Sequence, residues 1–338
     1  MFFRSIASAL PPRSWTQPEC WDALRDTEAV RTLLPRSRQL LEKVLLGNAG
    51  IHTRHFATEQ IQTLARKGPQ QQCEDFEREA VQLGAQALQK ALQRADLAEV
   101  DALFVCTCTG NLCPGLSSHV AEQLHMPPTT YLADLTGAGC GATLPTLRAA
   151  CAYLAAHPSH RAAVLAVEIC SAAFYLNDDP GVLISLCLFG DGAAALLLDG
   201  EQVRADDKHF GHFHTLHLPQ HREKIRLVNR NGHLCNQLHR DVPDLAADAV
   251  FSLSQKKPLE ERSLISHGGG RDVLEAIQKR LPGHPLLEAK NVLSHCGNMS
   301  SPSVLFALEQ ALQTDSSRRF WITSFGAGFA AHSCTLEP

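Results

Sequence analysis

The strongest constraint on the fold is a series of short apolar segments in which polar residues do not alternate with apolar ones. These segments cover residues 100–110, 162–174 and 188–200. A strand with one face in water alternates apolar and polar residues, whereas a strand covered on both faces is apolar throughout. Amphipathic helical patterns separate the segments, most clearly over residues 73–95. The sequence therefore predicts an α/β protein whose sheet is covered by helices on both faces.

Three glycine-containing turns in this pattern carry side chains with catalytic chemistry. Cys140 lies in TGAGCG, His267 in SHGGG and Asn298 in CGNMSS. We interpret each turn as the link from a strand to the following helix. At such a turn, backbone N–H groups and the helix dipole favour the thiolate form of a cysteine. Three equivalent turns with a cysteine, a histidine and an asparagine predict one shared active site.

Composition excludes several classes of protein. The 338 residues carry a formal net charge of only −4, which gives no sign of nucleic-acid binding. No apolar run approaches the roughly 20 residues that span a membrane. The 12 cysteines are scattered and form no CxxC pair, which favours reduced thiols in the cytoplasm over disulfides or a zinc site. We therefore expect no metal, no nucleic-acid partner and no membrane partner.

Beyond these local patterns, the chain resembles the thiolase superfamily, most closely the type III polyketide synthases of the chalcone synthase kind. The resemblance covers nearly the whole chain and rests on GCGATLPTLR, LFGDGAAA, SHGGGRDVLEAI, CGNMSSPSVLF and FGAGF. It implies an α/β thiolase fold, a duplicated αβαβα arrangement of five layers with two central mixed sheets. The N-terminal half, residues 1–200, would carry the nucleophilic cysteine. The C-terminal half, residues 201–338, would carry the histidine and the asparagine.

The resemblance also implies roles for the three turn residues. Cys140 would take an acyl chain from a thioester, and His267 would keep this cysteine as a thiolate. His267 and Asn298 would then stabilise the charge that forms when a malonyl thioester loses CO₂. The carbanion would attack the acyl-Cys140 thioester in a Claisen condensation. This chemistry requires no cofactor.

Further residues match substrate-binding positions of the family. Phe189 matches an aromatic residue that gates the pocket. The remaining expected pocket residues are Cys108, Thr109, Cys170, Ala173, Cys235 and Ser300. Most are small, which suits a long or bulky acyl chain.

The chain also departs from the plant enzymes of the family. The second gating phenylalanine, expected just after Gly232, is absent, and Leu234 or Cys235 takes its place. Three cationic positions that hold coenzyme A align with Leu41, Val44 and Asn48, while Arg38 and Lys43 lie nearby. Acyl-CoA and an acyl carrier protein therefore both stay open as the donor. By analogy, the loop of Cys113 predicts a homodimer.

Several functions fit these observations. The leading interpretation is a condensing synthase that extends β-ketoacyl or malonyl thioesters and releases an α-pyrone or a resorcinol-type ring. An alternative is an enzyme similar to ketoacyl-ACP synthase III, which performs one condensation on carrier-bound substrates or joins two carrier-bound chains. A non-catalytic partner subunit is less favoured, because Cys140, His267 and Asn298 are all present. A metal-binding protein built on the many cysteines and histidines is weaker still.

Overall fold

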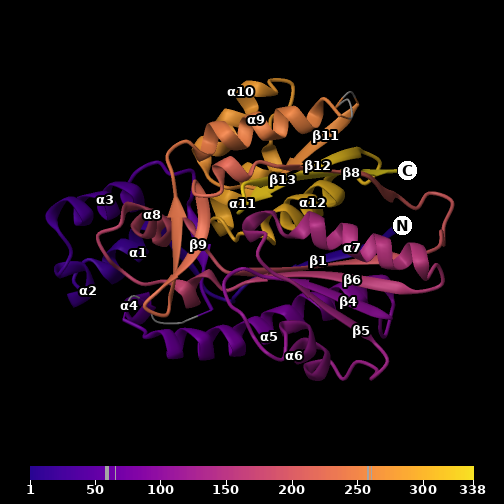
Figure 1. The fold of residues 1–338 in the computed structure, drawn as a ribbon, viewed down its shortest axis with the longest axis horizontal. Coiled ribbons are helices and arrows are strands. Elements are labelled where there is room, and N and C mark those ends of the chain that lie inside the picture. The colour runs from indigo at the N-terminus through magenta and orange to yellow at the C-terminus, as the bar shows by residue number, and fades with distance from the viewer. Residues whose placement is uncertain (58–60, 65, 257–258, 260) are drawn as a thin grey trace.

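The chain forms five layers of helices and strands (Figure 1). The structure, a computed structural model, describes residues 1–57, 61–64, 66–256, 259 and 261–338. Helices α5 (Pro69–Ala95) and α6 (Leu116–Gln123) cover one outer face. Helices α9 (Val242–Ser254) and α10 (Arg271–Arg280) cover the other. Between the two strand layers lie the helices α7 (Thr143–Ala156), α11 (Leu287–Cys296) and α12 (Ser303–Thr314).

The strand order repeats between the two halves of the chain. The first half contributes β1 (Phe2–Ala9), β4 (Ala102–Cys106), β5 (Tyr131–Leu135), β6 (Arg161–Glu168) and β7 (Gly192–Asp199). The second half contributes β8 (His209–His217), β11 (Arg262–Ser266), β12 (Arg319–Gly326) and β13 (Ala330–Glu337). The order β4-β6-β7-β1 matches β11-β12-β13-β8, and in each series the first pair is parallel and the other two pairs are antiparallel. This repeat supports a duplicated chain, while the boundary at residue 200 stays a prediction.

One detail differs from the expected arrangement of two separate sheets. The two series join into one nine-stranded mixed sheet, because β1 and β8 pair along their edges at Phe2 and His209. Only β5 extends the first series, and the described second half has no strand in the corresponding place. The five layers remain as expected, since the sheet folds back around the central helices (Figure 1).

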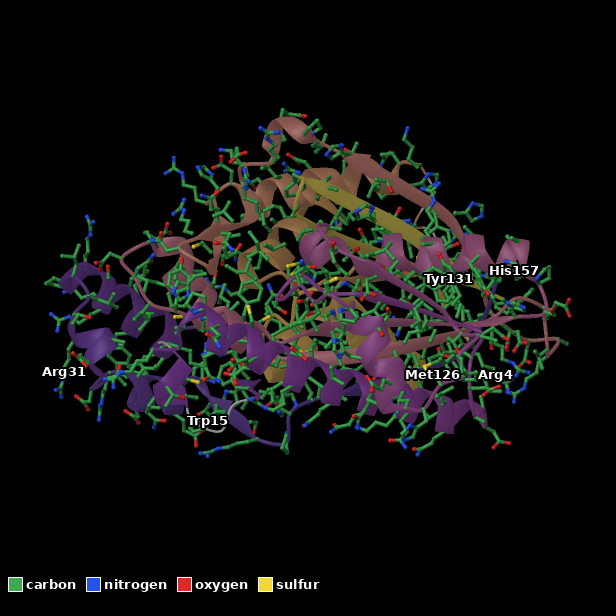
Figure 2. All side chains as sticks on the ribbon, turned by 60° about the horizontal axis from the view of Figure 1, so that its bottom comes forward. Arg4, Trp15, Arg31, Met126, Tyr131 and His157 are labelled. Atoms are coloured by element: carbon green, nitrogen blue, oxygen red, sulfur yellow. The ribbon has the colours of Figure 1, made fainter. Side chains whose placement is uncertain are left out.

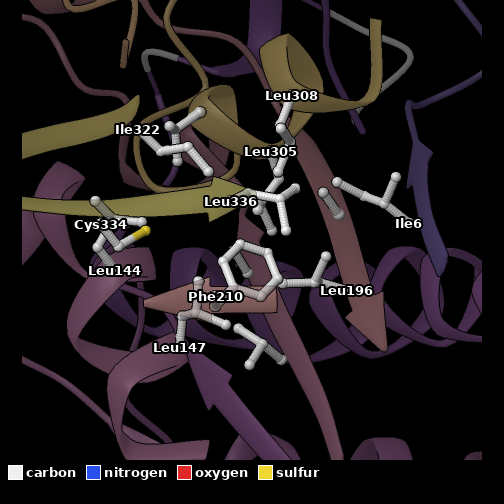
Figure 3. Packing of buried hydrophobic residues seen from close by; sticks show 14 of the residues in the cluster. Ile6, Leu144, Leu147, Leu196, Phe210, Leu305, Leu308, Ile322, Cys334 and Leu336 are labelled. Atoms are coloured by element: carbon white, nitrogen blue, oxygen red, sulfur yellow. The ribbon is translucent and has the colours of Figure 1, made fainter. Parts of the chain in front are cut away.

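The main hydrophobic core lies where the central helices meet both strand layers (Figure 3). Leu144 and Leu147 of α7 and Leu305 and Leu308 of α12 are buried there. The residues from Val304 to Leu308 are all buried, as expected because this first half of α12 is apolar on every side. This core fixes the helix ends that carry the candidate site.

Smaller elements extend the molecule at one end. They are β2 (Ser14–Thr16), α1 (Gln17–Leu24), α2 (Glu28–Arg31), α3 (Pro35–Leu46), β3 (Thr53–His55), α4 (Ile61–Leu64), α8 (Pro180–Leu188), β9 (Ile225–Arg230) and β10 (His233–Leu238). Figure 2 shows Arg31 of this end and Tyr131 of β5 on opposite sides of the long dimension. In the part of the chain that the structure describes, no helix is both long and apolar enough to cross a membrane.

Candidate active site

Cys140 lies in a single 3₁₀ turn, Gly139–Gly141, between β5 and α7. Gly139 has a φ of 56°, and a Cβ atom there would lie 3.1 Å from the backbone nitrogen of Ala327. Glycine therefore allows this turn to approach the β12–β13 connection closely. The Ser324 hydroxyl donates to the Gly141 carbonyl oxygen over 3.0 Å, which holds the turn against the second half of the chain.

Ser300 links two of the predicted cysteines. Its hydroxyl donates to the Cys140 sulfur over 3.1 Å and lies 3.2 Å from the Cys108 sulfur. Ser300 has a φ of 58°, in the left-handed region that side chains other than glycine rarely adopt. Ser300 thus combines a strained backbone with a hydroxyl that contacts the candidate nucleophile.

His267 follows β11 and is buried. Its backbone N–H donates to the Thr323 carbonyl oxygen over 3.0 Å, and its ring packs edge-on against Phe325. The Nδ1 atom has no hydrogen-bond partner among the described residues, whereas Nε2 lies beside Gly269 at the cavity. The chemically useful nitrogen of His267 is therefore Nε2.

Two backbone contacts fix the amide of Asn298. Its Nδ2 donates to the Gly269 carbonyl oxygen over 3.2 Å, and its Oδ1 accepts from the Ser300 N–H over 2.8 Å. These contacts define which end of the amide is the nitrogen, and one Nδ2 hydrogen stays available to the cavity.

The predicted strand before Asn298 is wrong, because helix α11 ends there. Ala289, Val292, Leu293 and Cys296 are buried at helical spacing, and so short an apolar run does not distinguish a helix from a strand by itself.

The electrostatic environment favours uncharged forms of both candidate catalytic groups. Burial raises the pKa of the Cys140 thiol to about 12, although the Ser300 hydrogen bond opposes this shift. Burial also lowers the pKa of His267 to about 4. The shifts favour a thiol at Cys140 and a neutral imidazole at His267, because desolvation of the charged forms opposes the effect of the helix dipole at the turn.

A cavity of about 990 Å³ connects these groups. Cys140, His267 and Asn298 all line it, and its wall is mainly apolar. Six of the seven predicted pocket residues line it as well: Phe189, Cys108, Thr109, Cys170, Ala173 and Ser300. The structure thus brings these side chains together, while their roles stay predictions. No group of three or more potential metal ligands occurs within the described residues.

Cys235 is the exception among the predicted pocket residues. It is 2% exposed, does not line the cavity, and accepts a hydrogen bond from the Tyr175 hydroxyl over 2.5 Å. Alternate residues of a strand face opposite sides, so Leu234 and Asn236 of β10 line the cavity instead. Of the two residues predicted to replace the missing phenylalanine, only Leu234 thus lines the cavity, and the replacement itself stays a prediction.

Cationic side chains also line the cavity. They differ from the three family positions that hold coenzyme A, which align with uncharged residues here. Of these residues, Val44 and Asn48 line the cavity, whereas Leu41 is buried outside it. Lys43, Arg226, Arg240 and Arg271 contribute positive charge to the same lining. Arg226 and Arg271 form ion pairs with Glu223 and Asp272. Lys43 thus lies on α3 with the aligned positions Leu41 and Val44, whereas the three arginines come from β9, from α10 and from the segment between β10 and α9.

Glu168 is a functional candidate that the sequence-based predictions missed. This buried carboxylate accepts hydrogen bonds from the backbone N–H groups of Cys108 and Thr109, and from the Ser301 hydroxyl over 2.6 Å. It thus ties the loop of Cys108 to the segment of Ser300. A signal was present, because Glu168 interrupts the apolar run LAVEIC, where an acid must have buried partners.

Known proteins share this fold. The crystal structure of 1,3,6,8-tetrahydroxynaphthalene synthase from Streptomyces coelicolor, a bacterial type III polyketide synthase, matches with a TM-score of 0.87 and 23% identity, covering 99% of both chains. The thiolase-type α/β fold predicted from the sequence is therefore confirmed.

The sequence comparisons assign the family. The model of the FAE1/type III polyketide synthase-like proteins matches residues 17–252, and the chain belongs to this family. It is 29% identical to 3,5-dihydroxyphenylacetyl-CoA synthase of Streptomyces toyocaensis, over 69% of this chain and 65% of the relative. It is 30% identical to the alpha-pyrone synthesis polyketide synthase-like Pks18 of Mycobacterium tuberculosis, over 74% of this chain and 66% of the relative. These alignments span about two thirds of each relative's length.

Proposed function

We propose that this protein is a type III polyketide synthase-like condensing enzyme that carries its growing chain on Cys140. The observation that carries the proposal is that Cys140, His267 and Asn298 line the same mainly apolar cavity. Family membership supports the same reaction class. An apolar wall suits an acyl chain, while the polar groups converge at one place.

The neutral pair defines the loading step. The Cys140 sulfur attacks the carbonyl carbon of an acyl thioester, and Nε2 of His267 accepts the thiol proton. The bond from the carbonyl carbon to the donor sulfur then breaks, and the proton passes to the departing thiol. A thiolate therefore exists only while the substrate reacts, which fits the raised pKa of Cys140.

The extension step uses Asn298. A malonyl thioester loses CO₂, and the electron pair of the broken C–C bond passes to the thioester oxygen as an enolate. Nε2 of His267 takes a proton from water, and this N–H and the free Nδ2 hydrogen of Asn298 donate to the enolate oxygen. The enolate carbon attacks the acyl-Cys140 carbonyl carbon, the bond from that carbon to the Cys140 sulfur breaks, and the proton of His267 passes to the sulfur. Cyclisation of the product to an α-pyrone or a resorcinol-type ring completes the proposal.

The donor and the assembly belong to the same proposal. The cations Lys43, Arg226, Arg240 and Arg271 at the cavity favour a phosphate-bearing pantetheine thioester, whether coenzyme A or an acyl carrier protein. We also propose a homodimer, because β5 is an edge strand whose Tyr131 is 51% exposed. The expected location is the cytoplasm.

Intact-protein mass spectrometry tests the proposal. The protein is incubated with acyl-CoA and with acyl carrier protein of matching chain length in parallel. We expect a mass gain equal to the acyl group with at least one donor, and its loss in Cys140→Ala. The control is Cys73→Ala, because Cys73 is an exposed cysteine that does not line the cavity. A mass gain that persists in Cys140→Ala contradicts the assignment of the nucleophile, and the donor that works distinguishes coenzyme A from a carrier protein.

A further inference from the structure

Arg54 of β3 is a buried arginine next to the candidate site. It is 1% exposed, and its Nε donates to Gln17 Oε1 over 2.9 Å. Its Nη1 donates to the carbonyl oxygens of Leu186 and Phe189 over 2.5 and 2.9 Å. Every one of these acceptors is neutral.

A buried guanidinium without a counter-charge is costly to keep. Among the described residues, no carboxylate lies within ion-pair distance of Arg54, since it forms none of the observed salt bridges. Two features compensate in part. The acceptor carbonyls lie at the end of α8, where the helix dipole is negative, and the guanidinium lies 4.9 Å from the ring centroid of Phe56. A lysine could not reproduce the planar guanidinium that donates to Gln17 through Nε and to both carbonyl oxygens through Nη1.

The chain segment that Arg54 holds is the one that pairs with Asn298. Phe189 and Asn298 form a parallel β-bridge, in which Asn298 N–H donates to the Leu188 carbonyl oxygen over 2.9 Å and Gly190 N–H donates to the Asn298 carbonyl oxygen over 3.1 Å. The aliphatic part of Arg54 also packs on Gly297, where a Cβ atom would lie 2.9 Å from the Arg54 Cγ. Arg54 therefore contacts both segments whose pairing aims Asn298, although it does not line the cavity.

We propose that Arg54 is a positioning residue for the extension step, and that it sets the direction of the Asn298 amide by clamping the end of α8 against the segment of Gly297. The inference rests on the proposed function, because it assumes that Asn298 stabilises the enolate. Arg54 contacts no substrate and contributes only through Asn298. Its loss should therefore impair decarboxylation and leave acyl loading on Cys140 intact.

The test measures two reactions of Arg54→Lys. Turnover of malonyl-CoA to acetyl-CoA and CO₂ reports the role of Asn298, while the rate of iodoacetamide alkylation reports Cys140. We expect the decarboxylation kcat to fall about 100-fold, the size expected from a displacement near 1 Å. Alkylation should stay within about twofold, because no contact of Cys140 changes. Arg13→Lys is the matched control, since Arg13 is an exposed arginine whose guanidinium lies over Trp15, away from the cavity.

A double-mutant comparison separates positioning from general damage to the fold. In an Asn298→Ala background, Arg54→Lys should cause no further loss of decarboxylation, because the group that it positions is gone. If Arg54→Lys causes a further 100-fold loss in the Asn298→Ala background, the proposal is overturned. It is also overturned if Asn298→Ala impairs decarboxylation while Arg54→Lys alone decarboxylates at the wild-type rate. If Asn298→Ala leaves the decarboxylation rate unchanged, the role of Asn298 in the proposed function is refuted, and the role of Arg54 is refuted with it.

A second variant covers the case in which Arg54→Lys does not fold. Gln17→Ala removes the acceptor of Arg54 Nε and leaves both carbonyl contacts in place. We expect a decarboxylation loss of about tenfold, absent from the Asn298→Ala background, and unchanged alkylation of Cys140. Wild-type decarboxylation by a folded Gln17→Ala would then overturn the proposal.

Discussion

Replacement of Ser300 by glycine and by alanine separates backbone strain from the hydroxyl contact. Ser300 combines a φ of 58° with a hydroxyl that donates to the Cys140 sulfur. A left-handed conformation costs a residue with a Cβ about 1 kcal/mol relative to glycine. The hydroxyl contact contributes about 1 kcal/mol. Both replacements lose the hydroxyl contact, but only glycine releases the strain.

The expected order of stability follows from these magnitudes. Ser300→Gly should unfold with nearly the free energy of the wild type, and Ser300→Ala should be less stable by about 1 kcal/mol. Urea unfolding monitored by circular dichroism measures the difference. Ser303 is the matched control, because it is buried in the first turn of α12. There the order should reverse, since glycine in a helix is about 1 kcal/mol less favourable than alanine.

The refuting result is equally clear. If Ser300→Ala is as stable as Ser300→Gly, the left-handed backbone carries no penalty and strain has no part in aiming the hydroxyl. The functional effect should be the same in both variants, because each loses the contact that lowers the pKa of Cys140. Alkylation of Cys140 at a fixed pH should therefore slow to a similar extent in both.

Three further predictions concern the site. Because burial raises the pKa of Cys140 to about 12, its thiolate fraction, and hence its iodoacetamide alkylation rate, should rise about tenfold per pH unit from pH 7 to 10; a plateau below pH 8 would instead reveal a stable ion pair with an imidazolium. Gly297→Ala should lower the free energy of unfolding by about 2 kcal/mol or more, because φ is 71° and the new Cβ would lie 2.8 Å from a carbonyl oxygen. The control Gly283→Ala, where the new Cβ would have no atom within 4 Å, should change it by less than about 0.5 kcal/mol. Urea unfolding measures both. Cys235→Ala should leave the acyl-chain preference unchanged in a competition between thioesters, whereas Asn236→Phe should shift it toward shorter chains, since only Asn236 lines the cavity; an equal shift in both variants would contradict this orientation.

The periodic parts of the sequence were sufficient to predict most elements. The apolar runs became the buried strands β4, β6 and β7, and the amphipathic run over residues 73–95 lies within α5. The turns at Cys140 and His267 follow strands as predicted. Two errors came from short segments. The segment 290–296 is too short for its apolar spacing to distinguish a helix from a strand. In β10, an error of one residue in the alignment assigns every side chain to the wrong face of the strand.

Other features depend on contacts between distant segments, which no local pattern contains. The partners of Arg54 come from α1 and from the end of α8, and Glu168 accepts a hydrogen bond from Ser301, 133 residues away in sequence. The raised pKa of Cys140 likewise follows from burial of the thiol in the folded chain. The turn at residues 139–141 alone indicates a thiolate, because the dipole is local whereas desolvation is a property of the whole fold.

The duplicated topology explains why Cys140 and Asn298 meet. Cys140 lies just before α7, and Asn298 lies just before α12, the helix of the second half that shares the central layer with α7. The two helix starts are in direct contact, because the Thr143 hydroxyl donates to the Ser301 carbonyl oxygen over 2.6 Å. The positive ends of two helix dipoles therefore face one site. They favour negative charge on the Cys140 sulfur or on an enolate oxygen beside Asn298, whereas burial disfavours a permanent charge there. Such a site keeps its thiol neutral at rest and stabilises charge only as the reaction creates it.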